Sequence, residues 1–418
     1  MSGFTVEHHV VRRPSSSMFG GSRGAGSYPD GITPAATPAT NPAYFEIVVG
    51  RDAPPGERSG DLVVAGQRLP VTLTIVPVTL PPIRLDVWAY FDQRELAWAQ
   101  GQGDQPVKAA ARAPSATERS CIDMFRTHGV LLSPDMAVEV WPARKELLFG
   151  FKDIPAWIPE DPTRAGEAVR AWIAATAGTG QVPFAIPIDE PRTPEARKRV
   201  RELADAVRAA GGGPNTFRFA VTDSPRPEYG DVIDLYISWN ASHLVGDRHD
   251  RWTYNGKPPR AGSVVLDTQT PGMRTWGWIA HRWKIPVWYV WDALYWHDRH
   301  NRRGAPLPGR ALDPAVDSVS FNDGEDHGNF DGVLALPAPD GCKRTLRLAA
   351  LRRGFQDRAL LELAARCDPA ATAKLAAEVM PRALGDAPDD GAPAWPADEA
   401  AWELARRKLL ELASCGAK

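Results

Sequence analysis

The chain has 418 residues, of which 43% are apolar and 24% charged, ordinary values for a soluble globular protein. Its 49 basic and 51 acidic residues are interspersed and give a net charge of −2, which argues against a nucleic-acid partner or a polybasic membrane partner. No apolar stretch reaches the roughly 20 residues that span a bilayer. The spacing of the four cysteines predicts neither a zinc site nor a redox motif nor a disulfide scaffold; they are Cys121, Cys342, Cys367 and Cys415.

The N-terminal part of the chain predicts β-structure without helices. Residues 1–44 are rich in Gly, Pro and Ser and predict an irregular segment; its glycines lack the Lys-Ser/Thr of a phosphate loop. Short runs with β character follow at 44–50, 60–66 and 67–80, with turn residues between them. We therefore expect a small antiparallel β-sandwich over residues 1–81.

From residue 82 onward, strand and helix patterns alternate. Strands are predicted at 83–91, 129–134, 181–188, 216–222, 231–238, 285–292 and 331–337. Helices are predicted at 117–129, 165–178, 194–212 and 273–284. This alternation predicts a (β/α)8 barrel over 82–366, with an open doubly wound sheet as the alternative. Helical patterns at the end of the chain predict an extension over 367–418 that packs on the barrel.

An adjacent pair of acids, Asp189 and Glu190, ends the predicted strand 181–188. Pro191 cannot donate a backbone hydrogen bond, so the strand should stop there. In barrel enzymes the catalytic groups lie at the carboxyl ends of strands. Beyond the last ladder bond both acids can turn toward one pocket, where one can share a proton while the other stays charged. A helix-capping or solvated pair is the alternative.

Aromatic and amide residues near strand ends are candidates for binding a sugar. They are Trp88, Tyr90, Trp239, Asn240, Tyr289, Trp291, Tyr295 and Trp296. Tyr289 and Trp291 share one face of a strand by period two. Barrel core is the alternative for these aromatic residues, and a turn is the alternative for Asn240. No metal site is predicted, because the HDRHN segment at 297–301 has irregular spacing and is interpreted as a solvated loop.

Several motifs together resemble glycoside hydrolase family 123 and the related domain-of-unknown-function 4091 proteins. "IPIDEP" is similar to the family's Asp-Glu-Pro, and "SYPDGITP" and "VVGRDAPPGERSGDLVV" are similar to its N-terminal β-domain. "RTWGWIAHRWKIPVWYVW" resembles its Arg/Trp-rich helix and next strand, and "FDGVLALP" with "TLRLAALRRGFQDRALL" resembles its C-terminal segment. Tyr289-Val290-Trp291 stands where the family has Leu-Tyr-Trp, a difference near the expected pocket. Arg347, Arg352 and Asp357 are expected to hold a helix to the barrel.

The resemblance implies a retaining β-N-acetylhexosaminidase that favours N-acetylgalactosamine, uses no cofactor and relies on the substrate's own acetamido group. Asp189 would stabilise that group, and Glu190 would protonate the leaving oxygen and then activate water. A glycosidase for a non-acetamido sugar and a non-catalytic carbohydrate-binding protein are the alternatives. The expected partner is a glycan; the oligomeric state is left open. Family members are commonly exported, whereas residues 1–17 lack the apolar core of a signal peptide, which leaves an upstream start or a cytoplasmic location open.

Overall fold

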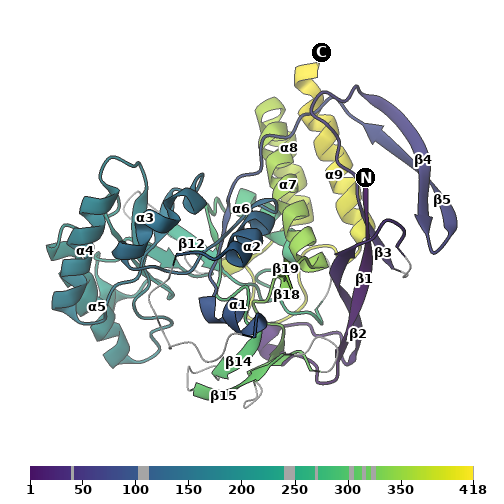
Figure 1. Cartoon of the computed structure of the whole chain (residues 1–418). Helices are drawn as coiled ribbons and strands as arrows, with labels where there is room; N and C mark the ends of the chain where they lie inside the picture. The colour runs from purple at the N-terminus through teal and green to yellow at the C-terminus, as the bar shows by residue number, and fades with distance from the viewer. Residues whose placement is uncertain are drawn as a thin grey trace.

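The computed structural model describes residues 1–38, 42–101, 113–239, 250–268, 272–300, 306–312, 317–321 and 326–417. At its centre is an eight-stranded, parallel sheet (Figure 1). Its strands are β6 (Val87–Ala89), β7 (Val130–Leu132), β8 (Asp153–Pro155), β9 (Val182–Ala185), β10 (Arg218–Val221), β11 (Leu235–Ile237), β12 (Asp250–Tyr254) and β13 (Trp288–Val290). From β8 to β13 each strand pairs with the next one in the chain, as β6 does with β7, so that β7 and β8 stand at the two ends of the strand order.

The first and last barrel strands of the chain pair with each other, and the two ends of the strand order also meet. β13 pairs with β6 in parallel, with Trp288 opposite Val87. β7 and β8 are joined by a parallel bridge between Met136 and Ala156, and the Trp157 amide donates to the Met136 carbonyl at 2.8 Å. The strands therefore follow one another around a ring, which confirms the predicted (β/α)8 class.

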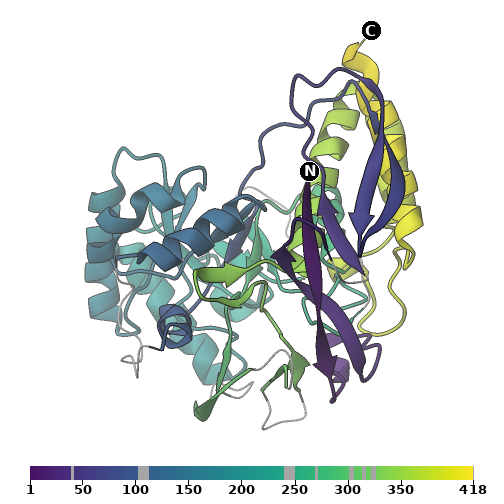
Figure 2. The ribbon, with the colours of Figure 1, turned by 45° about the vertical axis from the view of Figure 1, so that its right-hand side comes forward.

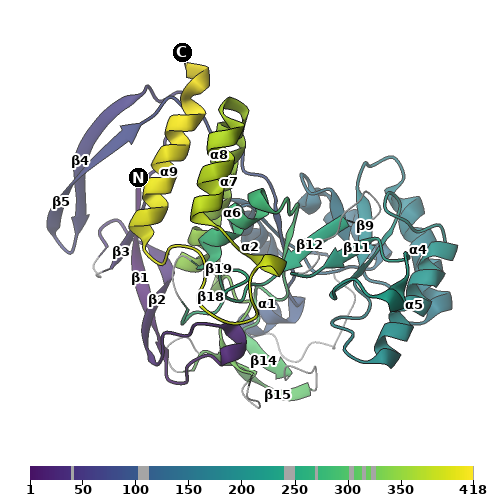
Figure 3. The ribbon, with the colours of Figure 1, turned by 180° about the vertical axis from the view of Figure 1, so that it is seen from behind.

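Helices cover the outside of the barrel and extend from one side of it (Figures 1 and 3). The helices are α1 (Gln93–Ala99), α2 (Ala116–Arg126), α3 (Trp141–Arg144), α4 (Pro162–Thr176), α5 (Pro194–Ala209), α6 (Thr275–Arg282), α7 (Leu346–Cys367), α8 (Pro369–Val379) and α9 (Glu399–Ala413). α4 and α5 lie together at one end of the molecule, while α7, α8 and α9 pack together at the other. Among the described residues, no helix is long and apolar enough to cross a bilayer.

Two of the barrel strands were not predicted, and one predicted strand lies elsewhere. β8 is three residues long and ends at Pro155, and β12 begins with the charged residues Asp250 and Arg251, so neither forms an apolar run. The predicted strand at 331–337 is wrong as a barrel strand. Only its end contributes to β18 (Leu336–Ala338), which forms a small hairpin with β19 (Gly341–Lys343).

The N-terminal residues form two small antiparallel sheets (Figure 2). β1 (Ser2–Val11), β2 (Gly26–Pro34) and β3 (Ala43–Glu46) make a three-stranded sheet, and β4 (Gly56–Val64) and β5 (Gln67–Ile75) make a separate hairpin. The irregular segment expected for 1–44 is wrong for β1 and β2. In β1 the buried residues Phe4 and Val6 alternate with polar ones, but the register shifts after Val6, which obscures the period-two pattern.

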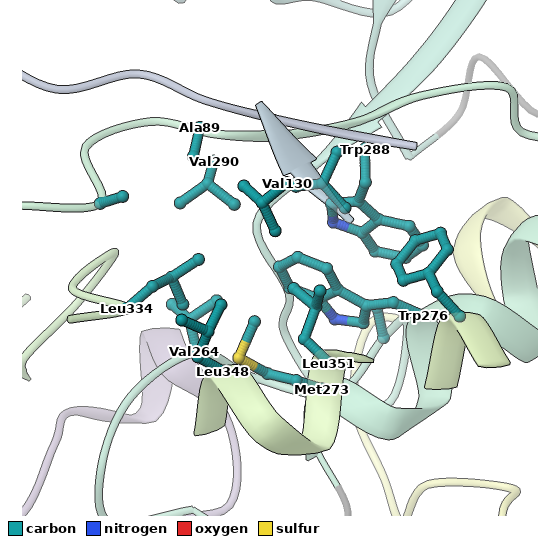
Figure 4. Packing of buried hydrophobic residues seen from close by; sticks show 14 of the residues in the cluster. Ala89, Val130, Val264, Met273, Trp276, Trp288, Val290, Leu334, Leu348 and Leu351 are labelled. Atoms are coloured by element: carbon teal, nitrogen blue, oxygen red, sulfur yellow. The ribbon is translucent and has the colours of Figure 1, made fainter. Parts of the chain in front are cut away.

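A tryptophan-rich core fills the space between the barrel and α7 (Figure 4). The Trp276 and Trp288 rings stack with centroids 4.5 Å apart, so α6 is fixed against β13. Leu348 and Leu351 of α7 pack into the same cluster and have no exposed surface. The indoles of Trp276 and Trp278 are therefore part of the core.

Buried ion pairs join α7 to its surroundings, the role predicted for its charged residues. Asp357 accepts from Arg274 Nε at 2.9 Å and from Trp278 Nε1 at 3.1 Å, and it also pairs with Arg406 of α9. Arg347 Nη2 donates to Asp30 of β2 at 2.8 Å. Because unpaired buried charges are strongly destabilising, these contacts specify how α7 sits between α6, α9 and the N-terminal sheet.

Two disulfides, which the cysteine spacing did not predict, link distant parts of the chain. Cys121 of α2 is bonded to Cys342 of β19, 221 residues later, and Cys367 at the end of α7 is bonded to Cys415 beyond α9, 48 residues later. Such separations leave no local motif. The first bond ties the outside of the barrel to the β18–β19 hairpin.

Removal of the Cys121–Cys342 bond should destabilise the protein. We expect the double variant Cys121→Ser/Cys342→Ser to lose about 2–5 kcal/mol of unfolding free energy, because cross-linking a long loop restricts the unfolded chain. Urea unfolding followed by circular dichroism would measure the loss. Cys367→Ser/Cys415→Ser is the matched control and should lose less, since it opens a shorter loop. Equal losses would contradict the loop-length explanation.

Candidate active site

A cleft of about 510 Å³ opens at the carboxyl ends of the central strands. Five consecutive strands, β9 to β13, each place side chains in it: Asp189 and Glu190, Thr222, Trp239, Tyr254, and Tyr289. This is the face on which barrel enzymes carry their chemistry. The predicted acids and three of the predicted aromatic residues, Trp239, Tyr289 and Trp291, therefore line one cavity, together with Tyr254, which was not predicted.

A single hydroxyl group links the two acids. The Glu190 amide donates to Thr222 Oγ1 at 2.7 Å, and Thr222 Oγ1 donates to Asp189 Oδ1 at 2.6 Å. Glu190 has a φ of +42°, a left-handed conformation that non-glycine residues rarely adopt. At this turn the side chains no longer alternate between the two faces as they do along a strand, and the neighbours Asp189 and Glu190 both line the cleft. Strain of this kind is stored at functional sites and has to be held by the surrounding structure.

The Glu190 carboxylate is held on the cleft wall by two partners. It forms an ion pair with Arg192, and the Tyr254 hydroxyl donates to its Oε1 at 3.2 Å. Both Glu190 and Arg192 keep part of their side chains exposed, so a ligand can reach the pair. A bound molecule can take the place of Arg192 beside the carboxylate without opening the core.

Asp189 is in a different electrostatic environment from an ordinary surface acid. Solvent reaches it through the open cleft, yet the surrounding protein displaces much of the water, and this desolvation raises the pKa of its carboxyl. The hydrogen bond from Thr222 opposes the shift, and the neighbouring Glu190 charge adds to it. The Asp189 carboxyl therefore ionises less readily than that of an ordinary surface aspartate.

The predicted aromatic residues divide between the cleft and the core. Tyr289, Trp291 and Trp239 line the cleft. Trp88 is 3% exposed and stacks against Tyr289, with ring centroids 4.5 Å apart, so it supports the wall from behind. Tyr90 is half-buried and packs beside the same core cluster.

Two further predicted residues lie deeper, and one lies outside the described part of the chain. Tyr295 and Trp296 are buried; the Tyr295 hydroxyl accepts from the Arg299 amide at 2.9 Å, and Trp296 Nε1 donates to the Ala335 carbonyl at 2.8 Å. Asn240 falls outside the residues that the structure describes. After Trp291, the side chains of Tyr295 and Trp296 therefore point into the core before the chain returns to the cleft at His300.

The N-terminal segment forms part of the cleft wall, which the sequence did not predict. Met18 and Phe19 of the short 3-10 helix η1 (Ser17–Phe19) line the cleft. Ser15 Oγ and Ser22 Oγ donate to Asp267 at 2.5 and 2.6 Å, and Asp267 is fully buried. These bonds fix both ends of the segment on the barrel, so residues far apart in sequence share one pocket.

Residues from the last third of the chain also line the cleft. His300, Phe321 and Asp331 line it together with Trp291. The solvated loop predicted for HDRHN is wrong, because β14 (His297–His300) pairs with β15 (Pro306–Ala311) and Asp298 is 2% exposed. Among the described residues, no group of three or more His, Cys, Asp or Glu side chains is arranged to hold a metal ion.

Next to Trp291 in the sequence begins a buried network in which one guanidinium forms ion pairs with three acids. Arg299 pairs with Asp92 and Asp292 at 2.6 Å and with Glu95 at 2.9 Å. Asp92 is also paired with Arg94, and Glu95 with His297. Burial of Asp292, reinforced by the neighbouring charges of Glu95 and Asp92, raises its pKa to about 7. Asp292 directly follows Trp291, so the network supports that residue of the cleft.

The raised pKa of Asp292 should make stability fall as pH rises. The unfolded chain releases this proton near an ordinary aspartate pKa, whereas the folded protein keeps it up to about pH 7. Between about pH 4 and 7 the folded state therefore binds more protons, and its free energy of unfolding should decrease by at most about 1.4 kcal/mol per pH unit.

Thermal unfolding of wild type and Asp292→Asn at pH 5 and pH 7 would test this expectation. The wild type should lose more stability than the variant over this interval, because the amide does not titrate. The same loss in both proteins would show that Asp292 is not the titrating group.

Comparison with solved structures places the whole chain in a known fold. One match is a family 123 glycoside hydrolase from Clostridium perfringens, described in a study of glycolipid glycan hydrolysis. It superposes with a TM-score of 0.61 and 10% sequence identity, and the match covers 99% of this chain and 84% of that one. A family 2 glycosyl hydrolase from Bacteroides cellulosilyticus matches at a TM-score of 0.30 and 12% identity, over 60% of this chain and 36% of that one, a level that carries no argument.

The sequence itself gives no further match. No protein-family model matches the chain, and the search of curated proteins finds no relative. At 10% identity the likeness to the family 123 enzyme shows a shared fold. The resemblance predicted from the motifs is thus confirmed as a resemblance in fold.

Proposed function

We propose that this protein is a retaining glycoside hydrolase that removes a terminal, β-linked N-acetylhexosamine, with N-acetylgalactosamine favoured. The observation that carries the proposal is the pair Asp189 and Glu190, held by Thr222 on one wall of a cleft at the mouth of the barrel. The shared fold with a family 123 glycoside hydrolase supports the same class of reaction.

Two acids on one wall suit a reaction in which neither attacks the sugar. A retaining glycosidase with a protein nucleophile places its carboxylates on opposite sides of the scissile bond, about 5–5.5 Å apart. Here the acids are neighbours in sequence, and Thr222 bonds the carboxylate of Asp189 and the backbone amide of Glu190. The nucleophile is then the acetamido oxygen of the substrate, which attacks the anomeric carbon and forms an oxazolinium ion.

Each acid has one task in this scheme. Glu190 donates a proton to the glycosidic oxygen as the bond to the anomeric carbon breaks. It then accepts a proton from the water that opens the oxazolinium ion, which restores the acetamido group with retention of configuration. Asp189 accepts a hydrogen bond from the acetamido N–H and stabilises the positive charge of the ion. The Tyr289 and Trp291 rings on the cleft wall offer apolar faces to a pyranose.

Nitrophenyl glycosides would test the proposal. We expect nitrophenol release from the β-N-acetylgalactosaminide or the β-N-acetylglucosaminide, and inhibition by the thiazoline analogue of the oxazoline. Cleavage of the β-galactoside or β-glucoside, with no effect of the thiazoline, would show a glycosidase for a non-acetamido sugar. Failure to cleave any of these compounds, with the protein folded, would overturn the proposal.

A further inference from the structure

Asn255 is a cleft residue to which the proposed reaction gives no task. It directly follows β12, and it lines the cleft together with its neighbour Tyr254. Resting on the proposed function, we infer that the Asn255 side chain binds the substrate. Its Nδ2 amide group donates a hydrogen bond to a ring hydroxyl of the sugar that is held at the acids, so Asn255 selects among sugars by the hydroxyls that they present.

Three hydrogen bonds fix Asn255 against the end of β13. Its backbone amide donates to the Tyr289 carbonyl at 2.8 Å, and its backbone carbonyl accepts from Trp288 Nε1 at 2.7 Å. Its side-chain oxygen Oδ1 accepts from the Trp291 amide at 3.2 Å. Asn255 is therefore bonded to the backbone of both aromatic residues on the cleft wall, and its position relative to them is set.

The bond to the Trp291 amide decides which way the carboxamide of Asn255 points. A backbone N–H can only donate, so its partner is the oxygen of the carboxamide, and the NH2 group lies on the other side. Among the residues that the structure describes, none accepts a hydrogen bond from Nδ2. Nor is Nδ2 one of the fully buried polar atoms that lack a partner, so solvent reaches it. Because Asn255 lines the cleft, its two N–H donors are open to a ligand there.

A left-handed backbone conformation brings Asn255 into the cleft beside its neighbour. Asn255 has a φ of +45°, which asparagine adopts more readily than most residues. Successive side chains of a strand point to opposite faces, but at this turn Tyr254 and Asn255 both line the cleft, as Asp189 and Glu190 do. Such a conformation persists where the surrounding structure holds it, and the three bonds to the end of β13 do so here.

The surroundings of Asn255 place its donor next to the terminal sugar. On one side, the Tyr254 hydroxyl donates to Glu190 Oε1 at 3.2 Å, beside the proposed proton donor. On the other side, Tyr289 and Trp291 form the apolar wall. A pyranose between Glu190 and this wall has Asn255 as its neighbour. A carboxamide N–H is an uncharged donor that suits a hydroxyl. The acetamido oxygen is a poorer partner, because a donor there would weaken its attack on the anomeric carbon.

A cycle of enzyme variants and deoxy substrates tests the inference. Asn255→Gly removes the carboxamide and keeps the left-handed backbone, which glycine adopts freely. Asn255→Asp keeps an oxygen for the Trp291 amide and replaces the N–H donors by a second oxygen that only accepts. The substrates are the nitrophenyl glycoside of the N-acetylhexosamine that the wild type cleaves and its analogues, in which the hydroxyl at carbon 3, 4 or 6 is replaced by hydrogen or, with the same configuration, by fluorine.

We expect the wild type to lose kcat/KM by about 3- to 15-fold on one of the three deoxy analogues, the effect of one hydrogen bond. Asn255→Gly should lose a similar factor on the parent glycoside and nothing further on that analogue, while it responds to the other two as the wild type does. Loosening of Trp291 in this variant lowers all four rates together and cancels in the ratios. If Asn255→Gly and the wild type lose the same factor on every analogue, no hydroxyl depends on Asn255 and the inference is wrong.

The fluoro analogues test the direction of the bond. Carbon-bound fluorine accepts a hydrogen bond weakly and never donates one. The ratio of fluoro to deoxy cleavage at the coupled position should therefore be about fivefold or more lower in Asn255→Asp than in the wild type, because two acceptors would face each other. The inductive effect of fluorine is common to both enzymes and cancels. An equal ratio in the two enzymes would show that Asn255 does not donate to that hydroxyl.

Failure of the proposed function would be visible separately. A wild type that cleaves a β-galactoside or β-glucoside instead is assayed with the deoxy series of that sugar, and the same ratios decide the role of Asn255. A wild type that cleaves none of these glycosides is titrated by calorimetry with N-acetylgalactosamine, N-acetylglucosamine and their deoxy analogues. A loss of affinity for one analogue in the wild type but not in Asn255→Gly would support the inference. Binding without such a difference, or absent binding, would refute it.

Discussion

Replacement of Glu190 by Gln is expected to lower kcat for an unactivated N-acetylhexosaminide by about 10²–10⁴-fold. The amide cannot donate a proton to the glycosidic oxygen, nor can it take one from water. Its shape is retained, so it can still accept from Tyr254 while the ion pair with Arg192 is lost. Steady-state kinetics on a trisaccharide in which the N-acetylhexosamine is β-linked to lactose, and on glycosides of graded leaving-group acidity, would measure the effect.

The leaving group separates the roles of the two acids. A nitrophenolate departs without much help from an acid, so Glu190→Gln should lose far less activity on the nitrophenyl glycoside than on the trisaccharide. Asp189→Asn should instead lose similar activity on both, because its partner is the acetamido group that all these substrates share. If Asp189→Asn shows the leaving-group dependence and Glu190→Gln does not, the two roles are exchanged.

Arg192 provides a control on the same wall. Arg192→Gln removes the cation beside Glu190 and leaves both acids in place. Since Arg192 is largely exposed and takes no part in the proposed proton transfers, its removal should change kcat much less than Glu190→Gln does. A loss as large as that of Glu190→Gln would mean that the ion pair itself is needed for turnover.

The acidic pair could be predicted because its signal is local. An apolar run that ends at two acids and a proline shows where a strand stops, and the barrel pattern indicates which end of the strand is functional. Tyr289 and Trp291 were accessible to the same reasoning through their period of two. Tyr295 and Trp296 were not, because beyond a strand end no periodicity tells a side chain that points inward from one that lines the cleft.

The N-terminal wall and the disulfides depend on contacts that leave no local pattern. Met18 reaches the cleft because Ser15 and Ser22 bind Asp267, roughly 250 residues away in the chain. Cys121 meets Cys342 across the fold in the same way. The glycine-rich composition of the residues around Met18 indicates a loop. It does not indicate which part of the protein this loop packs against, and that contact is what makes it a wall of the cleft.

Glycine at position 277 is expected to be indispensable, and Gly277→Ala should be among the most destabilising single substitutions in the chain. Gly277 lies in α6, and a Cβ there would be 1.9 Å from the carbonyl oxygen of Gly354 in α7. Neither atom belongs to a flexible side chain, so one helix would have to move. We expect a loss of about 3 kcal/mol or more, at or above the range typical of overpacked cores, measured by urea unfolding or seen as a failure to fold.

Gly166→Ala is the matched control, because it makes the same change inside another buried helix. A Cβ on Gly166 of α4 would meet its nearest atoms at 3.7 Å, an ordinary contact. Alanine should therefore stabilise the protein there by about 0.5–1 kcal/mol, since glycine loses more backbone entropy on folding.

In Gly277→Ala, a movement of α6 away from α7 would also break the contact of Arg274 with Asp357 and shift β13, which carries Tyr289. If Gly277→Ala folds as stably as wild type, the close approach of the two helices does not exist.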